Sequence, residues 1–397
     1  MRRAFRWLGL AVPSSTLVLV LAFGRNGFAS LGATPTGDRL ARMQQSPEWH
    51  DGKFHNAQPL WTDQRAAIQK SFSASPWVRP DSVDVVHPAT GFYTTPPATG
   101  LRVTWFGHSA SLIEIDGAAF LTDPTWSERT SPVSWAGPSR FFQPPVAMAN
   151  LPRIDAVLIS HDHYDHLDRS TIEALGKVAP RFIVPLGVGA DLVAWGIPEE
   201  HITEVDWWQS TSVAGVEVTA TPARHATGRV VPDGDRTLWV GYALRTPAHR
   251  VYYSGDTGLF PAMSEIGERL GPFDVALIEA GQYDSTWPDW HLGPEQAVEA
   301  SRMVRGKVMM PVHWALFRLA QHGWTEPAER VRAAAICQQV TTLIPRPGQP
   351  VEPTDTTLHI AQWWPSLPWQ TAAEHPVIAT RNGDPKDRVT KPGCRSS

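Results

Sequence analysis

The densest group of chemically active side chains is His161-Asp162-His163-Tyr164-Asp165-His166, which places three imidazoles and the Asp165 carboxylate within six residues. This segment follows Ile154–Ser160, a largely apolar run of the kind expected for a strand buried on both faces. A loop at the end of such a strand can direct alternate side chains into one crevice. Imidazole and carboxylate groups suit zinc, which takes them at about 2.0–2.2 Å. The segment therefore predicts a metal site, in which the first two histidines share one ion and Asp165 and His166 turn towards a second.

Three further candidate ligands each follow a predicted strand elsewhere in the chain: His225, Asp256 and His313. A single histidine after a strand is more often a hydrogen-bonded core residue than a ligand. Seven candidate positions arranged in this way favour a site for two ions. The two cysteines, Cys337 and Cys394, offer no zinc-knuckle spacing, so the ligands must be nitrogen and oxygen atoms.

The elements that would position these residues are short strands and helices in two successive series. The first series contains predicted strands at 101–106, 111–115, 119–122, 154–160 and 181–185 and helices at 170–178 and 188–195. The second contains predicted strands at 213–221, 237–245, 250–254, 273–279 and 307–312 and helices at 259–270, 294–304 and 326–339. This order predicts an α/β fold in which two sheets are sandwiched between helices.

The N-terminus has the order of a secretory signal. Arg2, Arg3 and Arg6 precede an apolar stretch from residue 7 to 23, and small residues follow up to Ala29. Residues 1–29 are therefore predicted to be a signal peptide or membrane anchor, and the protein is expected to be exported, periplasmic or membrane-associated. A buried N-terminal helix is the alternative. We further predict an irregular extension at 30–100, the hydrolase domain at 101–368 and a mobile tail at 369–397.

The chain from Leu101 to Arg332 resembles the metallo-β-lactamase superfamily, and within it N-acylphosphatidylethanolamine-hydrolysing phospholipase D and its bacterial relatives. The motifs that carry this resemblance are Trp105-Phe-Gly-His-Ser, Phe120-Leu-Thr-Asp-Pro, Gly137-Pro-Ser-Arg-Phe, the segment 158–168, Val205-Asp-Trp-Trp, Ser254-Gly-Asp-Thr-Gly, Gly271-Pro-Phe-Asp and His313-Trp. The resemblance implies an αββα sandwich. Leu316 and the short segment 226–229 depart from the pattern of these relatives, which leaves the shape of the substrate open but touches no proposed ligand.

The resemblance also implies ligand sets and roles. His161, His163 and His225 would hold one zinc; Asp165, His166 and His313 would hold the other; and Asp256 would bridge them. Two ions about 3.5–4 Å apart can share a water and lower its pKa towards about 7, which suits in-line attack on a phosphodiester. Manganese and iron tolerate overlapping ligand sets, so two Zn²⁺ are expected with Mn²⁺ or Fe²⁺ as alternatives.

Catalytic and substrate-binding roles are expected of residues near the ions. Asp165 is expected to serve catalysis as well as metal binding, and His291 to act as a general acid or phosphate-binding group. His108 is a second candidate for substrate contact, with a structural hydrogen bond as its alternative. Asp123 is expected to orient a metal-bound histidine, because carboxylates behind the ligands fix imidazole tautomers.

Composition limits the class of partner. Hydrophobic residues make up 42% of the 397 residues, which is enough for a large core and excludes a disordered chain. A net charge of −4 provides no basic face for nucleic acid, so a ribonuclease of this fold is disfavoured. Loops containing Trp126, Trp135, Trp207, Trp208, Trp287 and Trp290 could line an apolar groove for acyl chains.

The function that fits these observations is phospholipase-D-type hydrolysis of N-acylphosphatidylethanolamine or a related glycerophospholipid, with contact at a membrane surface. Two alternatives stay open. One is a lactonase or other ester hydrolase of the same fold, and the other is a non-catalytic envelope protein that binds metal or lipid. The oligomeric state is also open, a homodimer included.

Overall fold

The computed structural model describes residues 24, 26–70, 72–178, 181–229 and 234–393. The apolar stretch assigned to a signal or anchor, residues 7–23, lies outside the described residues. Within the described ranges, we find no helix with the length and apolar character needed to cross a membrane.

The first sheet has seven strands. It contains β3 (Leu101–Gly107), β4 (Ala110–Ile115), β5 (Ala118–Thr122), β6 (Ala156–Leu158), β7 (Phe182–Pro185), β8 (Ile202–Val205) and β15 (Pro350–Val351). They lie in the order β15-β3-β4-β5-β6-β7-β8, antiparallel from β15 to β5 and parallel from β5 to β8. The parallel strands β5 and β6 therefore end at the same edge of the sheet, where Asp123 and the His161–His166 segment follow them.

The second sheet has six strands. It contains β9 (Ser210–Val213), β10 (Val216–Thr221), β11 (Gly241–Arg245), β12 (Arg250–Tyr253), β13 (Val275–Glu279) and β14 (Met309–Val312). They lie in the order β14-β13-β12-β11-β10-β9, and β12, β13 and β14 are parallel to one another. Because β11 is antiparallel to both β10 and β12, β10 points the same way as these three strands. The residues that follow β10, β12 and β14 include His225, Asp256 and His313.

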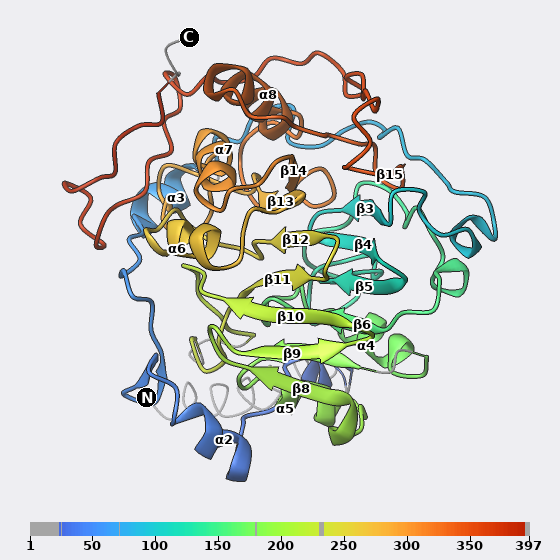
Figure 1. The fold of residues 1–397 in the computed structure, drawn as a ribbon. Coiled ribbons are helices and arrows are strands. Elements are labelled where there is room, and N and C mark those ends of the chain that lie inside the picture. The colour runs from blue at the N-terminus through green and yellow to red at the C-terminus, as the bar shows by residue number, and fades with distance from the viewer. Residues whose placement is uncertain (1–23, 25, 71, 179–180, 230–233, 394–397) are drawn as a thin grey trace, which may run out of the picture.

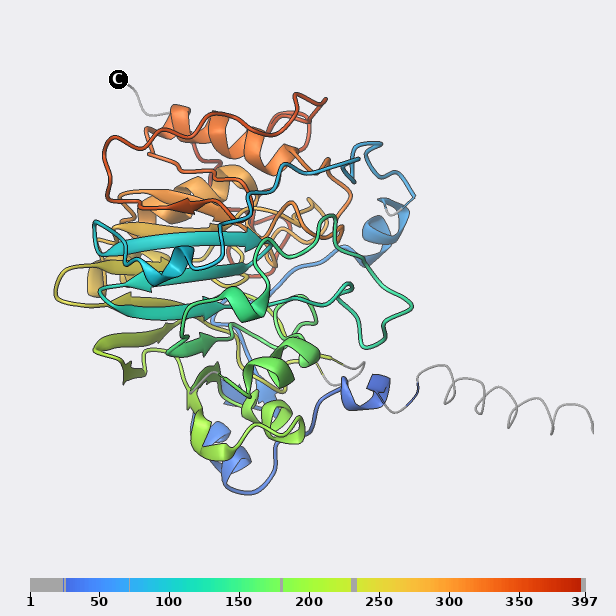
Figure 2. The ribbon, with the colours of Figure 1, turned by 90° about the vertical axis from the view of Figure 1, so that its right-hand side faces the viewer.

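Helices cover the outer faces of both sheets, as Figures 1 and 2 show. The helices of the first half are α4 (Arg169–Leu175), α5 (Gly189–Ala194), η2 (Met148–Asn150) and η3 (Glu199–His201). Those of the second half are α6 (Ala262–Arg269), α7 (Pro294–Met303) and α8 (Glu326–Gln338). α7 contacts β13 and β14 and supports α8, which lies at the top of the molecule in both views. The expected αββα sandwich is confirmed.

Alternation of apolar side chains along the strands produces two separate cores. Leu158 of β6 and Ile183 of β7 point into the core between the two sheets. Their neighbours Val157 and Val184 point to the opposite face, where they pack with Ile172 of α4. Because both faces of these strands are buried, their sequence is almost entirely apolar.

The predicted strand at 213–221 is two strands in the structure. Ala214 and Gly215 have φ angles of 51° and 83°, which turn the chain between β9 and β10 into a tight hairpin. The strand expected at 154–160 is also shorter, because only residues 156–158 pair within the sheet.

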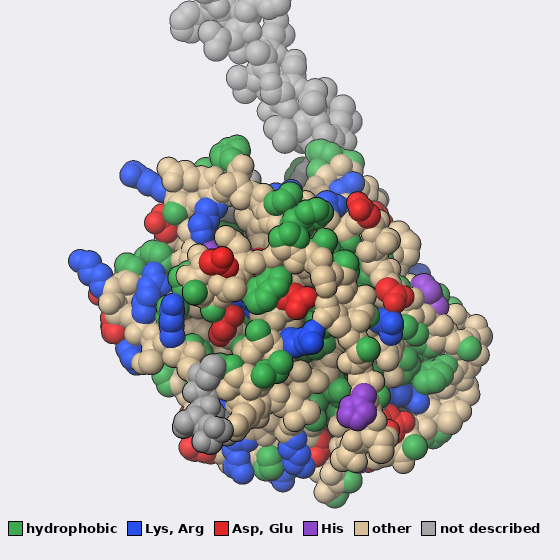
Figure 3. Space-filling model, turned by 90° about the horizontal axis from the view of Figure 1, so that it is seen from above, with side chains coloured by type: hydrophobic (Ala, Val, Ile, Leu, Met, Phe, Trp, Pro, Cys, Tyr) green, Lys and Arg blue, Asp and Glu red, His purple; other side chains and the backbone are tan. Residues whose placement is uncertain are grey.

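The segment expected to be irregular contains several short elements. They are α2 (Gly37–Met43), β1 (Trp49–His50), β2 (Lys53–Phe54), α3 (Gln64–Lys70) and η1 (Phe92–Thr94). At the other end of the chain, the described part of the expected tail contacts the domain through Val377, Ala379 and Thr380, which are buried. Figure 3 shows one face of the folded chain, on which charges of both signs and hydrophobic side chains are interspersed.

Candidate metal centre

The structure brings together all seven predicted metal ligands, which we call the metal centre. They come from both sheets and lie at the edge where their strands end. The first group of ligand atoms belongs to His161, His163 and His225. Nε2 of His161 lies 2.9 Å from Nδ1 of His163, and Nε2 of His225 lies 3.3 Å from the same atom. Three ring nitrogens that face one another at such distances form a pocket of lone pairs for a single cation.

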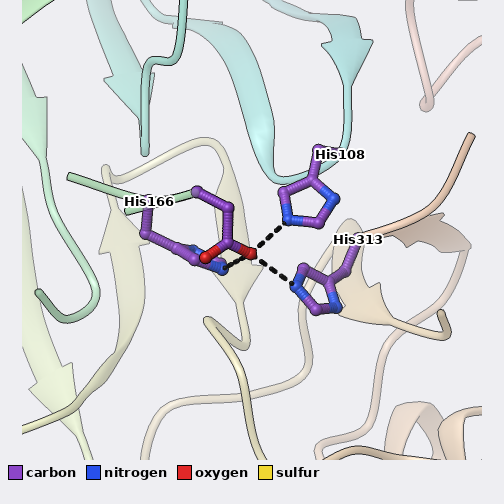
Figure 4. A group of neighbouring side chains, drawn as sticks. His108, His166 and His313 are labelled. Carbon is purple, nitrogen blue, oxygen red and sulfur yellow. Dashed lines mark hydrogen bonds and ion pairs between the residues drawn. The ribbon is translucent and has the colours of Figure 1, made fainter. Parts of the chain in front are cut away.

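The second group is Asp165, His166 and His313, with His108 beside them. Figure 4 shows His108, His166 and His313 around one carboxylate oxygen. The distances to the three rings identify it as Oδ2 of Asp165. That oxygen lies 3.3 Å from Nε2 of His166 and 3.5 Å from Nε2 of His313. The third neighbour, Nε2 of His108, lies at 2.7 Å.

Asp256 lies between the two groups. Its Oδ2 atom is 3.0 Å from Nε2 of His313 and 3.1 Å from Nε2 of His166. The same oxygen is 3.8 Å from Nε2 of His225 and 4.0 Å from Nε2 of His161. A carboxylate that reaches histidines of both groups has the position required of a bridging ligand.

The donor set fits divalent ions. The buried atoms Nε2 of His166, Nε2 of His313 and Oδ1 of Asp256 make no hydrogen bond. Burial of a polar atom without a hydrogen-bond partner costs free energy. Because these atoms converge on one place, we infer that bound cations are their missing partners. Two carboxylates and five imidazoles also match the nitrogen and oxygen ligands of zinc and related ions. The residues do not determine which metal is bound.

Electrostatics divide the histidines of the metal centre into two kinds. Burial, helped by neighbouring imidazoles, holds the pKa values of His161 and His225 well below the ordinary value, which keeps each ring neutral with one nitrogen free of a proton. Burial alone would also lower the pKa of His166 and His313. The Asp256 carboxylate and other nearby acids outweigh it and raise both pKa values well above the usual range. These two positions therefore favour positive charge.

Asp123 holds His166 from behind. The carboxylate is fully buried, and its Oδ2 lies 2.7 Å from Nδ1 of His166. The backbone N–H and the hydroxyl of Ser160 donate to it at 2.7 and 2.6 Å, and the hydroxyl of Tyr253 also donates. Because Nδ1 of His166 is committed to this acid, Nε2 is the nitrogen left for a metal.

Glu279 is a second buried acid behind the metal centre, and the sequence did not single it out. It ends β13, and its Oε2 lies 2.9 Å from Nδ1 of His291 and 3.3 Å from Nδ1 of His313. Its Oε1 accepts from the backbone N–H groups of Thr257 and Leu292. The sequence did contain a signal for Glu279. It is a carboxylate at the end of an apolar predicted strand, and the metal ligands also follow strand ends.

The two candidate substrate residues occupy different places. His291 lines a cavity beside the metal centre, where its Nδ1 lies 3.7 Å from Oδ2 of Asp256. His108 is 1% exposed and lies behind Asp165, and burial together with nearby His313 lowers its pKa to about 3. A hydrogen bond from its backbone N–H to the carbonyl of Trp314 fixes it there. His108 is not among the residues that line the cavity over the metal centre, and its role stays a prediction.

The cavity over the metal centre has a volume of about 320 Å³. Besides ligands it is lined by Thr62, Gln282, Trp287, Trp290 and Leu319. Of the six tryptophans expected to shape a groove, two line this cavity. Trp126, Trp207 and Trp208 instead pack against the hydrophobic cores, and Trp135 is 63% exposed.

Asn56 of the N-terminal extension fixes the backbone of the ligand His225. The Asn56 side chain donates to the carbonyl of His225 at 2.7 Å and accepts from its backbone N–H at 3.0 Å. Next to His225, the buried Arg224 guanidinium donates to the carbonyls of Gln58, Pro59, Leu259 and Thr380 and pairs with Asp289 at 3.0 Å. Neither Asn56 nor Arg224 was predicted, since their partners are remote in sequence.

Comparisons with known proteins agree with this geometry. A family model described as a beta-lactamase superfamily domain matches residues 119–314. An uncharacterized protein of Mycobacterium tuberculosis is 44% identical over 348 residues, which cover 85% of this chain and 92% of the relative. N-acyl-phosphatidylethanolamine-hydrolyzing phospholipase D 1 of Caenorhabditis elegans is 35% identical over 247 residues, which cover 59% of this chain and 69% of the worm protein.

A solved structure shares the fold. The structure of a protein from Veillonella parvula, described as a possible metal-dependent hydrolase, covers 63% of this chain and 98% of its own, with a TM-score of 0.50 and 17% identity. The resemblance read from the motifs is thus confirmed at the level of the family. This chain belongs to the metallo-β-lactamase superfamily and is a metal-dependent hydrolase with a His/Asp metal-binding cluster.

Proposed function

We propose that this hydrolase cleaves the phosphodiester bond of N-acylphosphatidylethanolamine or a related glycerophospholipid, in the manner of a phospholipase D. The observation that carries the proposal is the cavity wall beside the metal centre. Trp287, Trp290 and Leu319 make this wall apolar, and no Lys or Arg is among the described residues that line it. Such a wall suits a lipid rather than a polyanion. The 35% identity to the worm phospholipase supports the same choice.

The residues of the metal centre would hold two divalent ions, zinc being our first choice. Bound there, such ions lower the pKa of water towards about 7 and neutralise charge that grows on phosphoryl oxygens. His291 lies on the cavity wall with Nδ1 engaged by Glu279, which leaves Nε2 for the substrate. We propose that this nitrogen donates a proton to the oxygen of the departing alcohol.

The test is turnover of N-acylphosphatidylethanolamine in mixed micelles by metal-loaded protein, with mass spectrometry of the products. We expect N-acylethanolamine and phosphatidic acid, and loss of both in the Asp165→Asn variant. A phosphate-free lactone serves as the competing substrate. Turnover of the lactone without turnover of the phospholipid would favour an ester hydrolase and overturn the proposal. Metal bound in full with no turnover of either would favour a non-catalytic binding protein.

We also propose that the protein is exported and touches a membrane surface. Phe28 and Trp135 are 49% and 63% exposed. Trp135 lines one hollow of about 550 Å³, to which Gly27 and Ser30, close to Phe28 in the chain, also contribute. Exposed aromatic rings beside polar groups suit the interface of a bilayer. Co-sedimentation with vesicles should weaken in a Trp135→Ser variant, whereas unchanged sedimentation would contradict the proposal for this surface.

A further inference from the structure

A second cluster of metal-type ligands lies away from the metal centre, on the β1–β2 hairpin. Its members are His50, Asp51 and His55, whose ligand atoms all lie within 4.8 Å of one another. The other groups of this kind in the described part of the chain all contain residues of the metal centre. We propose that this hairpin cluster binds one divalent transition-metal ion of the nickel, copper and zinc class.

The hairpin backbone is fixed before any ion binds. Asp51 and Gly52 both have positive φ angles, 53° and 78°, as the tight turn between two paired strands requires. On the inner side, Trp49 packs edge-on against Phe54 at 4.9 Å, and Phe54 is only 1% exposed. The backbone N–H of Phe54 also donates to the carbonyl of Asp235 at 2.8 Å. Because these contacts fix the turn, its backbone loses little conformational entropy when the cluster binds an ion.

The two imidazoles are stacked face to face on the hairpin, and Nε2 of His55 lies 3.1 Å from the carbonyl of His50, which leaves Nδ1 of His55 for an ion. The rings of His50 and His55 stack at 3.4 Å with an angle of 11° between their planes. Nδ1 of His50 lies 3.2 Å from Oδ2 of Asp51. Two nitrogens and one carboxylate form a ligand set for borderline divalent ions, for which imidazole is a preferred donor.

The surroundings favour entry of a cation. The side chains of His50 and Asp51 are 56% and 87% exposed, so an ion and its remaining waters have access. Lys53 lies opposite His50 in the register of the two strands and is the one lysine or arginine on the hairpin. Its ammonium group lies 3.9 Å from Oδ2 of Asp235, which draws its charge to that carboxylate.

The test is calorimetric titration of the full chain with Ni²⁺ after two equivalents of Zn²⁺ per chain have saturated the metal centre and left the hairpin cluster free. We expect one Ni²⁺ per chain in the wild type and at least a tenfold weaker affinity in His50→Ala and in His55→Ala. His359→Ala, at an exposed histidine outside the cluster, is the matched control and should bind as the wild type does. Because none of these side chains is buried, thermal unfolding should be unchanged in every variant.

A spectroscopic readout tests the ligands directly. Cu²⁺ added to the zinc-saturated chain should give an electron paramagnetic resonance spectrum with coupling to two nitrogens in the wild type and to fewer in each single histidine variant. The proposal is overturned if the zinc-saturated chain takes up no Ni²⁺. It is equally overturned if the double variant His50→Ala/His55→Ala binds Ni²⁺ as tightly as the wild type. Neither outcome depends on catalytic activity, so this test is independent of the proposed function.

Discussion

Oε2 of Glu279 lies 3.3 Å from Nδ1 of His313, and this ion pair sets a buried acid against a residue of the metal centre. The negative charge of Glu279 favours a proton on Nδ1 of His313, which leaves the Nε2 lone pair to face Asp256. The metal centre is thus held by two acids behind it, with Asp123 setting the tautomer of His166 and Glu279 that of His313.

Glu279→Gln should weaken metal binding while preserving the shape of the residue. An amide has one acceptor and one donor end. With its oxygen towards the N–H groups of Thr257 and Leu292, its NH₂ faces His313 and forces the proton onto Nε2. We expect metal affinity to fall about 10–100-fold, measured by competition with a chelator. Glu265→Gln on the surface of α6 is the control. Equal affinity in both variants would contradict the orienting role.

Removal of the metals should destabilise the fold. Without them, the ligand nitrogens of His161 and His163 face one another at 2.9 Å, and Oδ1 of Asp256 is buried without a partner. Ions that bind only the folded chain add about 2.7 kcal/mol at one hundred times their dissociation constant. We expect chelation to lower the midpoint of thermal unfolding and zinc to restore it. A midpoint that does not move while elemental analysis shows the metals gone would refute this expectation.

Arg224→Met should cost much of the protein's stability. The guanidinium and the Asp289 carboxylate are buried, and removal of the arginine leaves that acid unpaired. Breaking a buried pair in this way costs about 3–5 kcal/mol of unfolding free energy. Arg153→Met is the matched control, because the Arg153 side chain is 85% exposed. Urea unfolding of both variants measures the difference, and similar losses would argue against the role of burial.

Stability should depend on pH through Asp191. Burial raises the pKa of this carboxyl from 3.8 to about 7, although the backbone N–H of Ala33 donates to it at 2.7 Å. The folded chain therefore holds the proton more tightly than the unfolded chain. The stabilisation is fully present below about pH 4 and is lost as the pH rises to about 7, by about 4 kcal/mol at most.

Asp191→Asn tests this assignment, because an amide oxygen can still accept from Ala33 but does not titrate. The difference in unfolding free energy between wild type and variant should change steadily in favour of the variant from pH 4 to pH 7. Asp81→Asn at an exposed position is the control. A difference that is flat over this range would show that Asp191 titrates normally in the folded chain.

The ligands of the metal centre were predictable because each follows a strand whose apolar pattern can be recognised from the local sequence. Asp256 and His313 follow β12 and β14, and parallel strands must end together. Arg224 and Asn56 were not predictable in the same way. Their partners are 166 and 169 residues away, and no local pattern records such a contact.

Local backbone geometry accounts for other differences. The tight turn at Ala214 and Gly215 interrupts what reads as one alternating strand. His108 follows a strand end as the ligands do, but its φ angle of 50° and its pairing with Trp314 set it behind Asp165. The sequence shows which side chains are available, whereas the backbone turn decides which of them reach the cavity.

Arg224 donates to carbonyl groups of segments that lie far apart in the chain, so its hydrogen bonds form late in biosynthesis. Thr380 leaves the ribosome long after the strands that bear the histidines, so the guanidinium acquires its full set of acceptors only after residue 380 has been synthesised. A polypeptide limited to residues 119–314 would keep all seven ligands yet lack Asn56, Gln58, Pro59 and Thr380. We expect such a fragment to leave His225 poorly placed, and the hydrolase to mature as one late, cooperative event.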